Sequence, residues 1–113
     1  MTHNKNKPIH KIEYYDKEKT KKYYEYWILN DQYHREDGPA YIGYCEDGSI
    51  RYENYYINNK LHREDGPAFI KYHKDGSVRY LEYHLNGEFY KKEIYLNKIS
   101  PQNRVKVLLN ETE

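Results

Sequence analysis

The chain has 113 residues, the length of one small domain, which excludes an enzyme built from separate catalytic and substrate domains. Its 19 Lys and Arg against 18 Asp and Glu leave a formal net charge of +1, which argues against a strongly basic nucleic-acid coat and against an acidic mimic of DNA. Fewer than a fifth of the residues are Ile, Leu, Val or Phe, but 16 are Tyr. Because disordered chains contain few aromatic residues, we expect a folded domain whose core consists largely of tyrosine rings.

The composition also bears on location. Cys45 is the single cysteine, so the chain can form no internal disulfide, and this favours a reducing compartment. No apolar run approaches the roughly 18 residues of a membrane span, and the start of the chain lacks the apolar stretch of a secretion signal. We therefore expect a cytoplasmic protein without a membrane span.

The chain is predicted to form a single repeat domain. Residues 1–11 are its lysine-rich, solvated start, since seven lysines and three acidic residues lie between residues 5 and 22. Residues 12–98 are the repeat core, and its first unit has an irregular turn over residues 17–22. Residues 99–113 are predicted to be a carboxyl-terminal cap.

Internal repeats give the strongest signal in the chain. The heptad His-Arg-Glu-Asp-Gly-Pro-Ala at residues 34–40 returns letter for letter at residues 62–68, an offset of 28 residues. At the same offset, residues 47–52 correspond to residues 75–80. A fixed period is typical of repeat proteins, in which each unit is one supersecondary structure.

Each unit is predicted to contain a short strand and a longer returning strand. Residues 40–44 and 68–72 place Ala, Ile and Tyr on one face by the period-two alternation of a strand. Asp47-Gly48 and Asp75-Gly76 then give the signal of a two-residue hairpin turn, in which glycine adopts a positive φ. The hairpin tips are therefore expected on one side of the sheet.

The returning strand carries two sets of large side chains of opposite parity. Either both faces of the sheet are partly covered, or a bulge between the two sets shifts the face. The first set is Tyr24, Tyr52 and Tyr80, and the second is Trp27, Tyr55 and Tyr83.

A second reversal connects one unit to the next. It starts at Asn58-Asn59 or Asn86-Gly87, residues that tolerate left-handed φ, and runs through the heptad. The glycine before the proline is expected to need a backbone region reserved for glycine, and the proline then directs the chain back into a strand. The predicted structural-turn residues are Asp37, Gly38, Pro39, Asp65, Gly66 and Pro67, with both aspartates accepting backbone N–H bonds inside the turn.

The array is predicted to end in a shortened unit that residues 90–96 close. After it, Ser100-Pro101 offers a helix cap and a first-turn proline, and Val105, Leu108 and Leu109 share a stripe. A short terminal helix over the last open sheet edge is therefore expected, with a final strand over residues 105–109 as the alternative. The predicted fold class is all-β: a meander of repeated antiparallel β-hairpins with a 28-residue period and a short carboxyl-terminal helix.

The repeating unit resembles a known family. Its Leu-His-Arg-Glu-Asp-Gly-Pro-Ala, short strand, Asp-Gly-Ser and tyrosine-rich strand are similar to the MORN-like repeats of many giant-virus, phage and bacterial proteins, over residues 12–98. The resemblance implies an elongated row of β-hairpins that serves interaction or scaffolding, with no catalytic residues. For a stand-alone module of this size it also implies a viral or phage counter-defence factor in the host cytoplasm, which inhibits a host enzyme such as a CRISPR effector by protein–protein contact.

The heptads concentrate an imidazole, a guanidinium and two carboxylates, which are groups used in metal sites and hydrolysis. Their spacing matches no zinc site, and the chain has no phosphate-binding loop, nucleophile elbow or His-Glu-x-x-His motif. Cys45 occupies a position that holds His73 in the next unit, so it is a poor nucleophile. We predict no enzyme, no catalytic residue, no metal site and no cofactor, and favour a structural role for the heptads, with a binding edge at Arg35 and Arg63 as the alternative.

The number of tyrosines exceeds what three hairpins can bury, so some rings are expected at the surface as binding residues. The predicted binding residues are Tyr26, Tyr41 and Tyr56, with Arg35 and Arg63 beside them. The predicted function is a protein-binding module. The alternative is a nucleic-acid or anionic-lipid binder that uses the amino-terminal lysines and exposed tyrosines; nucleic acid is disfavoured without a basic channel, and the salt dependence of binding distinguishes the two. Open sheet edges also allow oligomerisation.

Overall fold

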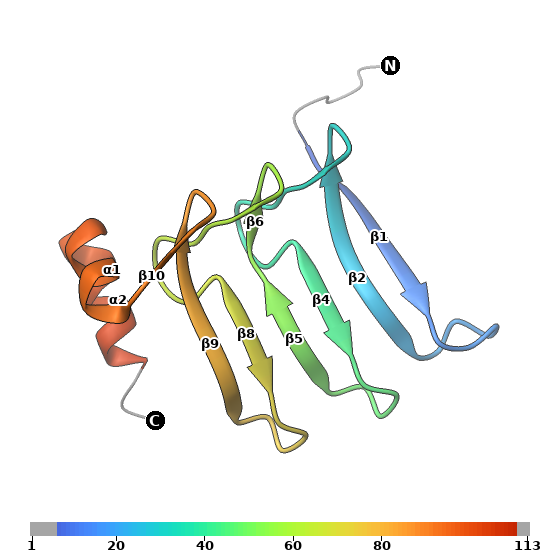
Figure 1. Ribbon diagram of the computed structural model, residues 1–113. Coiled ribbons are helices and arrows are strands. Elements are labelled where there is room, and N and C mark those ends of the chain that lie inside the picture. The colour runs from blue at the N-terminus through green and yellow to red at the C-terminus, as the bar shows by residue number, and fades with distance from the viewer. Residues whose placement is uncertain (1–6, 111–113) are drawn as a thin grey trace.

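Figure 1 shows the computed structural model, which describes residues 7–110. Residues 1–6 of the predicted lysine-rich start and residues 111–113 of the predicted cap lie outside the described residues. Strands are the main regular structure of the described chain, because aromatic and apolar side chains alternate with polar ones. The elements are β1 (Ile9–Tyr14), β2 (Lys22–Leu29), β3 (Gln32–Tyr33), β4 (Tyr41–Tyr44), β5 (Ile50–Asn54), β6 (Tyr56–Ile57), β7 (Lys60–Leu61), β8 (Phe69–Tyr72), β9 (Val78–Leu85), β10 (Glu88–Tyr90), α1 (Lys92–Lys98) and α2 (Pro101–Leu109).

The strands form one antiparallel meander in the order β1-β2-β4-β5-β8-β9-β10. β3 pairs with the end of β2, and β6 and β7 form a separate two-stranded ladder. The predicted meander of antiparallel hairpins with a short carboxyl-terminal helix is therefore confirmed. The molecule measures 45 × 40 × 20 Å, and the strands lie in a single layer, with the helices beyond β9 and β10 at the end opposite β1 (Figure 1).

The Asp-Gly loops are all on one side of the sheet, as predicted (Figure 1), but they differ in detail from the two-residue turn. The N–H of Gly48 donates to the carbonyl of Cys45 over 2.9 Å, and the N–H of Cys45 donates to the carbonyl of Ser49 over 2.8 Å. Only Gly48 has a positive φ, of 91°. The loop is therefore a three-residue connection with glycine in the left-handed position, and residues 73–77 repeat it.

The reversal that connects one unit to the next turns at its asparagines, as predicted. Asn58 and Asn59 have φ of 50° and 66°, and Asn86 and Gly87 have φ of 51° and 86°. Residues 30–31 also both have positive φ. Two consecutive positive values are the mark of the type I′ turn, which matches the twist of the strands that it joins.

The two sets of large side chains on the returning strands lie on opposite faces of the sheet. β2 runs from Tyr24 to Trp27 in one continuous register with β1. The bulges lie outside that stretch, where one extra residue is inserted at Tyr23 in β2, Arg51 in β5 and Arg79 in β9. Of the two alternatives that the sequence leaves open, the structure thus shows the first, in which both faces are partly covered.

The predicted terminal helix is confirmed by α2, whereas α1 is a second helix that was not predicted. The Ser100 side chain caps α2 by accepting the N–H of Asn103 over 3.1 Å, and Pro101 occupies the first turn, so the alternative strand over residues 105–109 is excluded. The segment expected to close the array, residues 90–96, instead ends β10 and begins α1. Its Lys, Glu and Leu are good helix formers, and the helix carries Tyr95 to a buried position.

The core lies at the carboxyl-terminal end of the sheet, where Tyr83 of β9 packs against Tyr95, Ile99 and Val107 of the helical region. The stripe of Val105, Leu108 and Leu109 was predicted to cover the sheet edge, but these residues are 45–65% exposed. The buried residue of α2 is Val107. Elsewhere the buried apolar residues are Ile42 of β4 and Ile70 of β8, with Ala40 and Ala68 directly before these strands.

Candidate functional site

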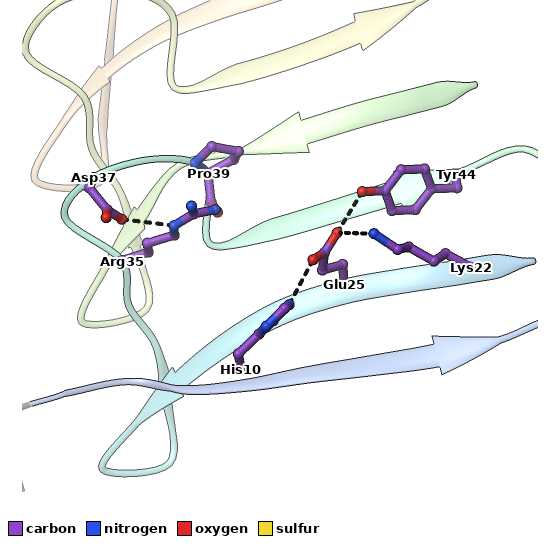
Figure 2. A network of polar contacts seen from close by, with 7 residues as sticks. All are labelled: His10, Lys22, Glu25, Arg35, Asp37, Pro39 and Tyr44. Carbon is purple, nitrogen blue, oxygen red and sulfur yellow. Dashed lines mark hydrogen bonds and ion pairs between the residues drawn. The ribbon is translucent and has the colours of Figure 1, made fainter. Parts of the chain in front are cut away.

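The first heptad is a loop folded around its own arginine (Figure 2). Arg35 donates from Nε to Oδ1 of Asp37 over 2.9 Å and from Nη1 to the carbonyl of Pro39 over 3.1 Å. Its guanidinium lies over the ring of Trp27, 3.8 Å from the ring centroid. Three separate contacts therefore fix the guanidinium, so that the charged group acts as the centre of the loop.

The second heptad repeats the arrangement. Arg63 donates to Asp65 over 3.0 Å and to the carbonyl of Pro67 over 3.1 Å, and its guanidinium lies 4.1 Å from the ring centroid of Tyr55. The predicted aspartates thus accept the arginine side chain of their own loop, where backbone N–H groups were expected as donors. This contact was not visible in the sequence, because residues two apart in a loop have no fixed relative orientation.

The histidine of each heptad holds the next hairpin turn. Nδ1 of His34 accepts the backbone N–H of Asn58 over 3.1 Å, and Nδ1 of His62 accepts that of Asn86 over 2.9 Å. Since Nδ1 accepts, the ring proton lies on Nε2, which points to the glutamate of the same heptad. Each heptad is therefore linked to the turn of the following unit.

A cleft of about 680 Å³ separates the two heptad loops. Both heptads line it, with Tyr55 and Ile57 between them and Asn103 of α2. The guanidinium groups are used within their own loops, whereas the side chains of Glu36 and Asp37 are more than 80% exposed. The rim of the cleft is therefore acidic, and the arginines are not free to act as binding anchors.

The same face carries a buried carboxylate that sequence reasoning missed (Figure 2). Glu25 is 8% exposed, and it accepts hydrogen bonds from Tyr44 over 2.6 Å, His10 over 2.7 Å and Lys22 over 3.3 Å. Burial, the largest single influence, acts to raise the pKa of Glu25, but the three hydrogen bonds together outweigh it, so the pKa lies below its ordinary value of 4.5. In the sequence, the signal that could have identified Glu25 is a charged residue between aromatic neighbours in a strand.

The opposite face carries a continuous cluster of tyrosine rings, which we call the tyrosine face. Tyr41 is its centre, with ring centroids 5.2 Å from Tyr24 and Tyr33, 5.9 Å from Tyr26 and 6.0 Å from Tyr52. Contacts of the same kind extend the cluster at both ends. The tyrosine face consists of Tyr15, Tyr23, Tyr24, Tyr26, Tyr33, Tyr41, Tyr52 and Tyr56.

The rings of the tyrosine face are partly buried against one another but not covered. Tyr15 is 38% exposed and the other seven are of intermediate exposure. Within residues 7–110, no second layer of helices or strands covers this face (Figure 1). The result is a broad aromatic surface.

A glycine shapes this surface. Gly43 pairs with Tyr52 across β4 and β5, and a Cβ atom at Gly43 would lie only 2.2 Å from Cε1 of the Tyr52 ring. The ring therefore lies directly on the glycine backbone. In the next unit Lys71 takes the place of the glycine opposite Tyr80, and that ring is 49% exposed.

The structure separates the predicted binding residues into two groups. Tyr26, Tyr41 and Tyr56 belong to the tyrosine face, joined by Tyr33, which the prediction omitted. Arg35 does not lie beside them, because it stacks on Trp27, whose side chain is on the opposite face from Tyr26. Arg63 is likewise held over Tyr55 in the second heptad.

Among residues 7–110, no group of three or more His, Cys, Asp and Glu side chains is placed to hold a metal ion. The helices of this part of the chain are too short and too polar to cross a membrane. Comparisons with protein-family models, with curated proteins and with solved structures find no match to this chain.

Proposed function

We propose that this chain is a non-enzymatic protein-binding module whose contact surface is the tyrosine face. The observation that carries the proposal is the set of eight contacting tyrosine rings on a sheet face without a covering layer. Tyrosine offers a large, rigid contact area at low cost in side-chain entropy, and its hydroxyl group can bond to polar groups of a partner. Such rings are prominent among the residues that dominate binding energy in interfaces.

The arrangement of the rings supports this use over a purely structural one. The hydrophobic core at the helices is built around Tyr83 and Tyr95, which do not belong to the tyrosine face. The core does not extend to that face. Mutual contacts hold the rings in fixed positions, so a partner would meet a preorganised surface. The resemblance to MORN-like viral and phage repeats adds a class of partner to the proposal, a host enzyme that this chain inhibits by contact.

The test begins by isolating a protein that the full chain captures from an extract of its source cells, purifying that protein, and measuring its Kd by calorimetry. The test variant is Tyr26→Ala with Tyr56→Ala, since both rings lie away from the centre of the cluster and Tyr41 supports four neighbours. We expect the Kd to rise at least about 30-fold, the equivalent of one lost anchor. The matched control is Phe89→Ala, an aromatic residue of β10 that is 57% exposed.

Thermal unfolding of each variant shows whether the fold is retained. A Kd that is unchanged in the folded double variant would contradict the proposal. The alternative, a nucleic-acid or anionic-lipid binder, predicts instead that binding weakens steeply with salt and depends on lysines such as Lys11, Lys17 and Lys21. Binding through the tyrosine face is expected to change little with salt, because burial of aromatic surface does not depend on counterions.

A further inference from the structure

The outer edge of β1 is the unpaired end of the sheet. β1 is the first strand in the sheet order, and no strand within residues 7–110 pairs with its outer side. At the other end of the sheet, β10 covers the last three residues of β9, and the helices follow. Among the described residues, the amino-terminal edge therefore leaves backbone donors and acceptors unpaired, in the form that another strand can use.

The hydrogen bonds of β2 show which residues of β1 direct their backbone N–H and C=O groups toward β2. The N–H of Trp27 donates to the carbonyl of Ala40 on the β4 side. Because successive residues of a strand direct their backbone groups to opposite sides, the neighbouring Tyr26 points toward β1. Tyr26 pairs with Lys11, so Lys11 exchanges its backbone hydrogen bonds with β2.

The other residues of β1 follow by alternation. Tyr15 also faces β2, since its N–H donates to the carbonyl of Lys21 over 2.8 Å. His10, Ile12 and Tyr14 therefore direct their N–H and C=O groups outward, at the free edge. An approaching strand has to pair with these three residues.

The β1 sequence is complementary to itself in one such pairing. With Ile12 opposite Ile12 of a second copy, His10 lies opposite Tyr14, and Lys11 lies opposite Glu13. The three outward-facing residues then form the hydrogen-bonded pairs, with about six backbone hydrogen bonds in all. Lys11 and Glu13 fall at the closely spaced positions, where opposite charges on one face attract.

We propose that β1 is a self-association edge, through which two copies of the chain join by an antiparallel β1–β1 ladder centred on Ile12. A lysine in the middle of an edge strand normally opposes pairing, but in this register each Lys11 meets the carboxylate of Glu13 in the other copy. The dyad is perpendicular to the sheet, so both tyrosine faces lie on the same side. The proposal stands independently of the proposed function.

The experiment measures the mass of the full chain by sedimentation at several concentrations, with charge reversals in β1. The wild type is expected to be dimeric. Lys11→Glu alone, or Glu13→Lys alone, turns both attractive pairs into repulsive ones and is expected to raise the dimer dissociation constant at least about tenfold. A 1:1 mixture of the two single variants, and the double variant, each restore opposite charges at both pairs and are expected to dimerise again.

The control Lys74→Glu makes the same charge change in an exposed hairpin loop and should leave the dissociation constant unchanged. Circular dichroism of each variant shows whether it is folded, and the mixture tests pairing without further mutation. A monomeric wild type overturns the proposal. So does failure of the mixture to dimerise, or growth of the wild type beyond two copies.

Discussion

At Gly66 the guanidinium of Arg63 occupies the space that a side chain would take. A Cβ atom there would lie 2.7 Å from Cζ of Arg63, and at Gly38 it would lie 2.9 Å from Cζ of Arg35. Neither glycine has a positive φ, so the expectation of a backbone region reserved for glycine is wrong for both. The requirement for glycine comes from close approach of a side chain that three contacts hold in place.

This cause can be tested by a double-mutant cycle. Gly66→Ala is expected to lower the free energy of unfolding by about 1–3 kcal/mol, because the new Cβ displaces a fixed guanidinium. In the Arg63→Ala background the obstacle is gone, and the same substitution is expected to cost less than about 0.5 kcal/mol. Urea unfolding of the four proteins measures the coupling. An equal cost in both backgrounds would show that the backbone conformation is the cause.

At the scale of single elements, α1 shows how one side chain can attach a helix to a loop. Tyr95 is fully buried; its hydroxyl group lies 2.6 Å from the carbonyl oxygen of Arg63 and 2.9 Å from that of Gly66, and accepts the N–H of Gly66 over 3.1 Å. The ring also packs on Tyr83, with centroids 4.7 Å apart. The helix thus closes the array by packing on the second heptad.

Tyr95→Phe is expected to lower the free energy of unfolding by about 1–3 kcal/mol, because it removes the hydroxyl group and leaves buried backbone groups without their partner. Tyr90→Phe is the matched control, since its hydroxyl bonds to Glu88 at an exposed position and its loss is expected to cost less than about 0.5 kcal/mol. Chemical denaturation measures both. Equal costs would refute the anchoring role of the Tyr95 hydroxyl.

The elements were predictable from sequence where the signal is local. Asn58-Asn59 and Asn86-Gly87 mark their turns because few other residues adopt two successive positive φ angles. Helix α1 was not predictable from local pattern, because the apolar run of Ile94, Tyr95 and Leu96 is compatible with a strand as well as with a helix. The contact of Tyr95 with a distant loop favours the helix, and this contact cannot be seen in the sequence.

The candidate site was predictable only in part, for a related reason. The sequence predicts Tyr26, Tyr41 and Tyr56 as exposed rings, and they do share one surface. It also predicts Arg35 and Arg63 beside them, and that prediction is wrong because these arginines lie over Trp27 and Tyr55. A loop separates Arg35 from its strand, and the path of a loop decides on which face its side chain lies.

At the scale of the whole molecule, a single-layer sheet buries its tyrosines by contact with one another and with carboxylates. Tyr44 donates to Glu25 over 2.6 Å, and Tyr72 donates to Glu53 over 2.5 Å. Burial, and next the hydrogen bond to the carboxylate, raise the pKa of both tyrosines well above the ordinary value of 10.0. Burial also raises the pKa of Tyr95 to about 12.

These shifts predict alkaline unfolding. A tyrosine whose pKa is higher in the folded state holds its proton more tightly there, so its contribution to stability is complete below the unfolded value near 10.0 and is lost as pH rises through the folded value. We expect the free energy of unfolding to fall steeply above that pH. Replacing both Tyr44 and Tyr72 by Phe should flatten the decline, which urea titrations across this range measure. An unchanged slope would assign the effect to other groups.

The position of the buried cluster has a consequence for synthesis. Tyr83, Tyr95, Ile99 and Val107 all lie in the last third of the chain. Chains emerge from the ribosome amino-terminus first, so all strands from β1 to β8 are translated before any residue of that cluster. The contacts between the sheet and the helices can therefore form only after β9 and both helices have left the ribosome.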